Sequence, residues 1–169
     1  MTGSGVSGPP PAGTPSSSGV HFPPPLLYVA GFVLGLLLER AVRLRLMGGD
    51  GRRPVGTVGG WLAIVLGLGV MLWAIVTFMR ARTAVLPNQP ASRLVTTGLY
   101  ARSRNPMYVG LTLAYVGLAL LTNRGWPLVF LPLVLVTLHG LVIRREERYL
   151  SAAFPGEYAA YRQRVRRWL

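Results

Sequence analysis

The sequence alternates apolar segments with short polar stretches that are rich in Arg. The apolar segments run from about Leu26 to Leu38, Thr57 to Met79, Met107 to Leu121 and Trp126 to Ile143. The second has the roughly 20 residues that a helix needs to cross a bilayer, whereas the third is shorter. The first leaves open a helical extension through Leu46. We therefore predict an all-α, polytopic membrane protein with about four transmembrane helices.

The residues after the apolar segments predict how the chain turns and ends. Asn123-Arg124-Gly125 predicts a tight turn, so the last two segments should form an antiparallel hairpin. Beyond Ile143, apolar residues recur at spacings of three and four, the period of one helical face. They are Leu150, Phe154, Tyr158, Tyr161, Val165 and Trp168. With Arg filling much of the other face, this predicts an amphipathic helical segment on the bilayer surface, broken at Pro155-Gly156.

The N-terminal 25 residues differ from the rest. They are mostly Gly, Pro, Ser and Thr and have too little apolar content to bury a core. We predict a disordered tail over residues 1–25 and a single transmembrane domain over 26–169.

Charge placement bears on topology and partners. The net charge is +13, and all 18 basic residues are Arg, most of them at the ends of apolar segments. Cations in that position face anionic headgroups, so we expect membrane lipids and no nucleic acid as partners. The rule that positive loops stay inside places the 80–106 loop and the C-terminus in the cytoplasm. The membrane that we expect is a bacterial plasma membrane. Arg40 to Arg53 would then lie on the opposite side, which leaves open whether the first segment spans.

The residue inventory excludes several chemistries. There is no Cys, and His21 and His139 are the only imidazoles. Thiolate nucleophiles, Cys-based metal sites and a Ser-His-Asp triad are therefore not expected, and we predict no metal.

A turn-rich stretch from Thr96 to Tyr108 stands between two apolar segments. Gly98 permits a positive φ, and Pro106 suits the first turn of a helix, so Asn105 is predicted to cap that helix with its side chain. Tyr100 and Tyr108 offer aromatic faces to a purine or a cation. The alternative is an interfacial belt of Tyr residues beside an ordinary capped helix.

Two of the five acidic residues, Glu146 and Glu147, end the last apolar segment. Neighbours on a helix point about 100° apart, so only one of them should face a ligand site beside Tyr108. The alternative is a structural ion cluster with the adjacent residues Arg144, Arg145 and Arg148. Two further stretches, 83–87 and 92–95, are rich in residues that favour extended structure and predict a strap near the site.

Taken together, these motifs resemble the isoprenylcysteine carboxyl methyltransferase and phospholipid methyltransferase family of integral-membrane enzymes. The resemblance covers about Phe78 to Leu169. It rests on Leu94-Val-Thr-Thr-Gly-Leu-Tyr100, Arg104-Asn-Pro-Met-Tyr-Val-Gly110, Arg145-Glu-Glu-Arg-Tyr-Leu150 and Phe154 with Tyr158, Tyr161, Val165 and Arg167.

The resemblance implies an S-adenosyl-L-methionine site on the cytoplasmic side, built from about 78–110 and 144–169. The cofactor contacts that it implies are Leu94, Val95, Tyr100, Asn105, Pro106, Met107, Tyr108 and Glu146. Arg104 and Glu146 are the candidate catalytic residues, Arg104 for an anionic group and Glu146 for the polar end of the cofactor. The acceptor would be a lipid-like or small apolar carboxylate, thiol or amine.

Two positions depart from the family pattern. Asn105 stands where the family usually has His, which removes acid–base chemistry at that place. Val142 stands four residues before the first Glu, where the eukaryotic carboxyl methyltransferases have an Arg. Two other readings stay open: an NADPH-dependent membrane reductase of the sterol reductase type, and a membrane protein without catalytic activity.

Overall fold

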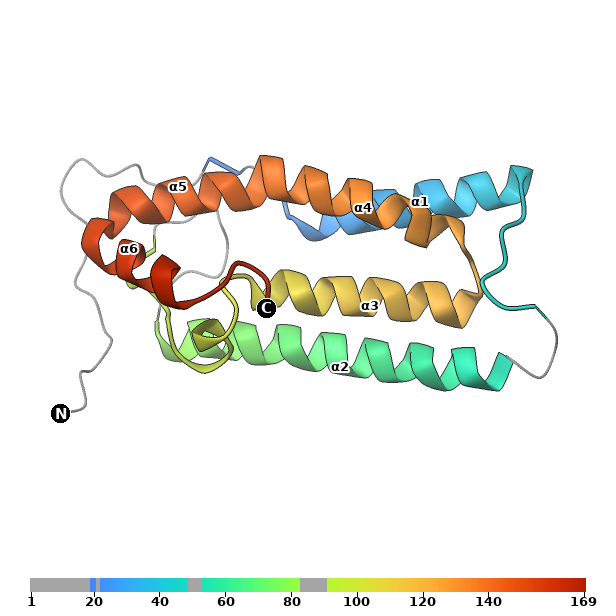
Figure 1. Cartoon of the computed structure of the whole chain (residues 1–169), viewed down its shortest axis with the longest axis horizontal. Coiled ribbons are helices and arrows are strands. Elements are labelled where there is room, and N and C mark those ends of the chain that lie inside the picture. The colour runs from blue at the N-terminus through green and yellow to red at the C-terminus, as the bar shows by residue number, and fades with distance from the viewer. Residues whose placement is uncertain (1–18, 21, 49–52, 83–90) are drawn as a thin grey trace.

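The fold is a bundle of long helices with one short helix folded back at one end (Figure 1). This computed structural model describes residues 19–20, 22–48, 53–82 and 91–169. These residues contain no β-strand, in agreement with the all-α prediction. The elements are α1 (Pro25–Ala41), α2 (Arg53–Arg80), a 3₁₀ turn (Gly98–Ala101), α3 (Pro106–Thr122), α4 (Trp126–Leu138), a π-helical turn (His139–Ile143), α5 (Arg144–Ala153) and α6 (Pro155–Arg164).

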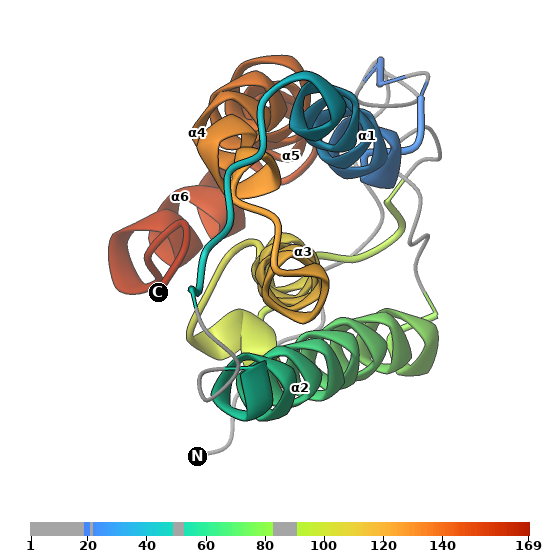
Figure 2. The same cartoon turned by 90° about the vertical axis from the view of Figure 1, so that its right-hand side faces the viewer.

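The helices pack as two pairs, α2 with α3 and α1 with α4. Seen end-on, α3 lies between α2 and the α1–α4 pair (Figure 2). The predicted hairpin of the last two apolar segments exists as a connection, since Asn123 takes the left-handed conformation between α3 and α4. However, these two helices each pack mainly against another partner.

Glycines set the close approach of α2 and α3. A Cβ at Gly67 would lie 2.5 Å from the Gly110 carbonyl oxygen, and one at Gly117 would lie 2.6 Å from the Gly60 oxygen. The two glycines of each helix are seven residues apart, so both pairs fall on one antiparallel seam. Small residues at such a seam allow the backbone contact on which helix association in lipid depends.

A glycine also allows the close approach of α1 to α4. Aromatic rings fill the space between this pair and α3. A Cβ at Gly35 would lie 2.6 Å from the backbone nitrogen of Pro127. Tyr115 of α3 packs edge-on against Phe32 and Tyr28 of α1, with ring centroids 5.2 and 6.0 Å apart. The Tyr115 hydroxyl donates to the Pro127 carbonyl at 2.7 Å, so its polar tip is satisfied inside the bundle.

Much of the bundle surface is apolar. Large side chains of α2 such as Val55, Leu62 and Val65 are more than half exposed, as are Leu133 and Val136 on α4. Two helices, Pro54–Arg80 and the continuous Trp126–Ala153, are long and apolar enough to cross a membrane, and only a small share of each is buried inside the protein. Surfaces of this kind are favourable against lipid and unfavourable against water.

The end of α1 differs from the extension considered above. The helix stops at Ala41, and Val42 is extended, because the Leu44 N–H donates to the buried Glu39 carboxylate at 3.0 Å. The following residues bind the α3–α4 turn: Asn123 exchanges hydrogen bonds with both backbone groups of Met47. The chain after α1 is thus tied across the end of the bundle rather than continuing as a helix.

The π-helical turn lies where α4 becomes α5. It inserts extra residues into a helix that runs without a break from Trp126 to Ala153. Such turns shift the face on which all later residues lie. The predicted break at Pro155-Gly156 is present, because Phe154 leaves the helical conformation and α6 begins at Pro155.

The residues just before α1 pack against the central apolar core. Val20 is 1% exposed and belongs to the central apolar core, against which Phe22 also packs. The Arg145 guanidinium donates to the Gly19 carbonyl at 3.3 Å. The sequence predicts a disordered tail through residue 25, and residues 1–18 of that tail lie outside the described residues.

The glycine seam gives a direct test. Replacing Gly67 with Leu should destabilise the protein by about 1–3 kcal/mol or more, because the added atoms meet backbone rather than flexible side chains. Thermal melting in detergent measures the effect. Gly69→Leu is the matched control, since a Cβ there meets nothing within 4 Å. Equal losses in the two variants would contradict a seam at Gly67.

Candidate functional site

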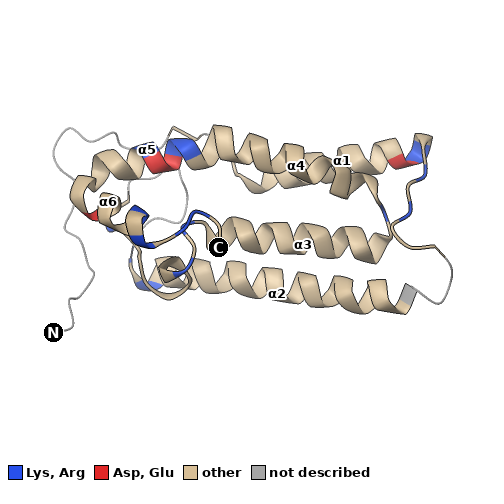
Figure 3. Ribbon diagram, in the orientation of Figure 1, with Lys and Arg blue, Asp and Glu red and all other residues tan. Residues whose placement is uncertain are grey.

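The charged residues of the described chain gather at the two ends of the bundle (Figure 3). One end holds Glu39 and nearby Arg residues. The other joins the segment before α3, the helix α5, the helix α6 and the C-terminus, which are the segments that carry the motifs singled out in the sequence. The segment before α3 and the C-terminus, predicted to lie on one side of the membrane, thus lie at the same end of the bundle.

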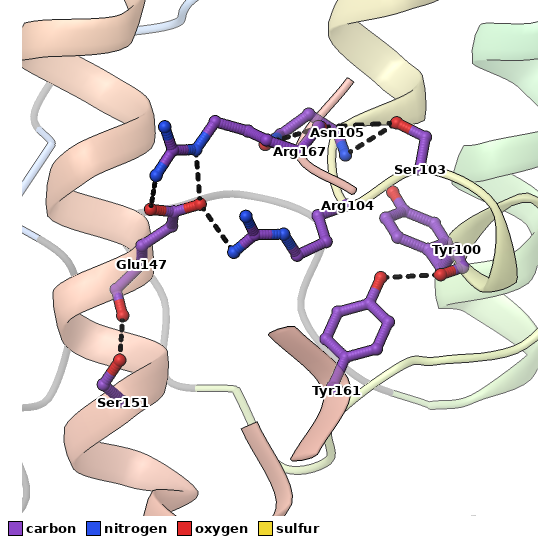
Figure 4. A network of polar contacts seen from close by, with 8 residues as sticks. All are labelled: Tyr100, Ser103, Arg104, Asn105, Glu147, Ser151, Tyr161 and Arg167. Carbon is purple, nitrogen blue, oxygen red and sulfur yellow. Dashed lines mark hydrogen bonds and ion pairs between the residues drawn. The ribbon is translucent and has the colours of Figure 1, made fainter. Parts of the chain in front are cut away.

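A carboxylate on α5 joins these segments (Figure 4). Arg167 binds Glu147 through two bonds, Nε to Oε1 at 2.9 Å and Nη2 to Oε2 at 2.7 Å. Nη1 of Arg104 lies 2.9 Å from Oε1 of the same residue. The side chains of Arg104 and Glu147 are only 10% and 13% exposed. We call this trio of Glu147, Arg104 and Arg167 the clasp.

The clasp corrects one alternative drawn from the sequence. The partners of Glu147 are not its neighbours Arg144, Arg145 and Arg148, but two Arg residues from distant segments. The Glu147 carboxylate also raises the pKa of the Arg167 guanidinium, mainly through their hydrogen bond. The pair of Arg104 and Glu147 is well shielded from water, and such a pair is costly to break from one side.

Backbone contacts reinforce the clasp. The Arg104 N–H donates to the Arg166 carbonyl at 3.0 Å, and the Asn105 side-chain amide donates to the Arg167 carbonyl at 3.0 Å. Asn105 does precede Pro106 at the start of α3, as predicted, but its side chain makes no capping bond to the helix. The amide holds the C-terminal segment instead, so the predicted capping role is wrong.

The aromatic residues of α6 pack beneath these contacts. Tyr158, Tyr161 and Val165 form a buried cluster with Leu94 and Tyr149. The Tyr161 hydroxyl donates to the Tyr100 carbonyl at 2.7 Å. Burial raises the pKa of Tyr161, which keeps this hydroxyl protonated as a donor. The amphipathic period seen in the sequence therefore packs α6 against the segment before α3.

The second carboxylate of α5 faces another way. Glu146 Oε1 accepts a hydrogen bond from the Tyr108 hydroxyl at 2.9 Å. The Tyr108 carbonyl in turn accepts from Thr112 at 2.8 Å and from Tyr28 at 3.3 Å. Burial raises the pKa of Tyr100, and the charges of Tyr161 and Glu146 raise it further. The Tyr108 phenol and the Glu146 carboxylate thus meet, a setting that favours a cationic ligand group.

A cavity lies between the end of α2 and the segment before α3. Its volume is about 400 Å³, within the range typical of small-molecule sites. Leu94, Val95 and Gly98 line it, and Gly98 has the positive φ, 62°, that the sequence suggested. Tyr100 packs next to it against Val95, with its ring edge-on to Phe78.

The residues predicted for the site therefore fall into three adjoining groups. Tyr108 and Glu146 are in contact, Leu94 and Val95 line the cavity, and Arg104 and Asn105 hold the C-terminal segment. Pro106 is fully buried and Met107 packs near Tyr100. The extended strap is described only in part: residues 92–95 form no strand, and 83–87 lie outside the described residues.

Sequence reasoning missed the pairing of Arg167 with Glu147 and the contribution of Tyr28 to this end of the molecule. The sequence gives one signal for the pairing of Arg167 with Glu147: two adjacent Glu residues on a helix must face different partners. Tyr28 lies in a segment without any recognisable motif, and only its fold places it on Tyr108. Among the described residues, no group of three or more His, Cys, Asp and Glu side chains is placed to hold a metal ion.

Removing the carboxylate of the clasp should lower the stability of the protein measurably. Glu147→Gln should lower stability by about 3–5 kcal/mol, because Arg104 is left with a buried charge and no carboxylate. Melting curves of purified protein measure the loss, and Glu157→Gln on the exposed face of α6 serves as control. The double variant Glu147→Gln/Arg167→Gln should lose less than the sum of the single variants; strict additivity would contradict the pairing.

Comparison with known proteins gives a consistent set of matches. A family model described as phospholipid methyltransferase matches residues 55–157. The protein-S-isoprenylcysteine O-methyltransferase of Saccharomyces cerevisiae is 33% identical over 111 residues, which cover 64% of this chain and 46% of that protein.

Two bacterial proteins also match. The cobalt-zinc-cadmium resistance protein CzcN of Cupriavidus metallidurans is 33% identical over 63% of this chain and 50% of its own length. The nickel-cobalt-cadmium resistance protein NccN of Alcaligenes xylosoxydans is 32% identical over 62% and 50%. The chain thus spans about half the length of the curated relatives it matches. No solved structure gives a significant match.

Proposed function

Because the chain belongs to the phospholipid methyltransferase family, we propose that it transfers a methyl group from S-adenosyl-L-methionine to a lipid-like or small apolar acceptor in the membrane. The family and the yeast relative support a membrane methyltransferase. The choice of methyl donor, the acceptor and the side of the membrane are the parts that we propose.

The observation that carries the proposal is the contact between Tyr108 and Glu146. These residues come from two motifs 38 positions apart, on α3 and α5, and meet at 2.9 Å. A carboxylate and the phenol bound to it suit the cationic sulfonium and ammonium groups of such a donor. The adjoining cavity, with Leu94 and Val95 in its wall, offers room for an apolar or aromatic part of the ligand.

The donor supplies an already activated methyl group when bound, so the residues of this chain need mainly to bind and orient. In this proposal Glu146 holds the positive end of the donor, and Tyr108 fixes the Glu146 carboxylate. Asn105 and Arg104 act by holding the C-terminal segment over the site. Asn105 does not titrate, so proton transfer is not assigned to it.

We further propose four membrane crossings, with α1 and α3 joining the two longer spans. The clasp would face the cytoplasm, since the segment before α3 and the C-terminus carry most of the Arg residues. Such an arrangement places the Tyr108–Glu146 contact near the membrane surface, within reach of a water-soluble donor and a lipid-soluble acceptor.

One residue, Val142, bears on the chemical class of the methyl acceptor. Val142 is fully buried within the central core, so a cation for an acceptor carboxylate is missing at the place where the eukaryotic carboxyl methyltransferases have Arg. Arg144 is exposed and lies outside that core. The same site therefore accommodates amine and thiol acceptors without any change in its charged residues.

Donor binding tests this proposal. Purified protein should bind S-adenosyl-L-methionine, seen by calorimetry and as a raised melting temperature, because a ligand of the native state stabilises it. Glu146→Gln should weaken binding by about tenfold or more, since it removes a charge partly shielded from water. Tyr108→Phe should weaken it less, and Glu157→Gln should leave it unchanged. Equal affinity in Glu146→Gln and the unaltered protein would contradict the site.

Methyl transfer is tested with membranes from a strain that lacks the protein. Adding the purified protein and donor with a labelled methyl group should place label in the lipid-extractable fraction. The expected product is heavier than its precursor by one methyl group in the mass spectrum. Glu146→Gln should abolish the labelling, whereas label found only in water-soluble products would contradict an apolar acceptor.

A further inference from the structure

The outer face of α5 forms a second concave surface, separate from the Tyr108–Glu146 contact. Gly140, Arg144, Arg148 and Ser151 follow one another at spacings of three and four along this face. Together with Arg162 and Arg167 they line a cavity of about 510 Å³, with Glu147 at its edge. We call it the outer groove. Glu146 is absent from its lining, so the two carboxylates of α5 serve different sides of the helix.

The outer groove carries a strong positive charge. Four guanidinium groups line it, and Glu147 is the one carboxylate. Glu147 is already bound by Arg104 and Arg167. Within the described chain, no carboxylate lies within ion-pair distance of Arg144, Arg148 or Arg162. These groups fit an anion with several oxygen acceptors, such as a phosphodiester.

An apolar stripe leads into the same groove along α4. Val129, Leu133 and Val136 are 54%, 58% and 69% exposed. They follow one another at spacings of four and three, and Gly140 comes four residues later. A Cβ at Gly140 would meet nothing within 4 Å, so packing against the protein's own atoms does not require glycine there. The stripe and the groove therefore form one surface, apolar along the bundle and cationic at its end.

We propose that this surface binds one anionic phospholipid, with its phosphate in the outer groove and an acyl chain along Val129, Leu133 and Val136. A soluble phosphate or an acidic peptide would use the Arg residues but not the apolar stripe. The bound lipid is not the methyl acceptor, because the groove opens on the side of α5 away from Glu146. It braces α5 against α6 across the outside of the clasp.

The test compares lipids on the purified full chain in neutral detergent. Phosphatidylglycerol should raise the melting temperature, whereas phosphatidylcholine, which has the same acyl chains and no net charge, should raise it much less. Arg144→Gln/Arg148→Gln should weaken phosphatidylglycerol binding by roughly tenfold or more, since each Arg near an anionic surface contributes about fivefold. Arg43→Gln/Arg45→Gln removes equal charge at the opposite end and should keep the binding.

A second variant leaves all charges in place. Gly140→Leu should block the junction between groove and stripe and weaken lipid binding several-fold, whereas Gly69→Leu on α2 should not. The proposal is overturned if Arg144→Gln/Arg148→Gln binds phosphatidylglycerol as tightly as the unaltered protein. It is also overturned if glycerol 3-phosphate stabilises as well as the lipid, which would indicate a soluble anion.

If the double variant does not fold, a competition experiment on the unaltered protein tests the proposal. Spin-labelled phosphatidylglycerol and phosphatidylcholine compete for its surface in mixed micelles. A preference for phosphatidylglycerol that glycerol 3-phosphate does not displace supports the proposal, and equal affinity for the two lipids overturns it.

Discussion

One carboxylate on α5 sets the arrangement of the polar end of the molecule. Glu147 takes Arg104 from the segment before α3 and Arg167 from the C-terminus, and both side chains must give up water to reach it. Shielded charges of this kind tolerate little displacement, because each loses its partner before water can replace it. The clasp therefore holds the C-terminal segment in one place. The hydrogen bonds of Arg104 and Asn105 to that segment, and the packing of α6, are consistent with that single placement.

The clasp joins the end of an apolar bundle that is built by a different rule. Between helices in lipid, apolar burial gives little driving force, so contact depends on how closely the backbones approach. Gly60 and Gly67 meet Gly117 and Gly110 along one seam, and Gly35 of α1 meets the Pro127 backbone of α4. The seam between α2 and α3 lies on the helix that also carries Tyr108, which Glu146 contacts from α5.

The helices were largely predictable from the sequence, because their signals are local. Apolar length predicted α2, Pro106 marked the start of α3, and Pro155-Gly156 marked the start of α6. The segments that the resemblance joined are in contact in the fold, where Tyr108 meets Glu146. Side-chain partners outside the helices were not predictable. Glu39 binds the Leu44 backbone, which closes the open question of a longer α1, and Asn105 bonds the C-terminal segment in place of its own helix. No pattern in the sequence predicts the partner of either side chain.

The pairing of the helices has a mechanical consequence. Each pair behaves as a stiff beam, because its seam is backbone against backbone, and the beams are fastened at both ends. One fastening is the clasp, and the other is the bonding of Met47 to Asn123. Between the fastenings the two pairs meet through side chains, such as the ring of Tyr115 on that of Phe32 and the Tyr115 hydroxyl on the Pro127 carbonyl. Displacing one pair from the other would therefore rearrange side chains and leave every helix with its own backbone hydrogen bonds.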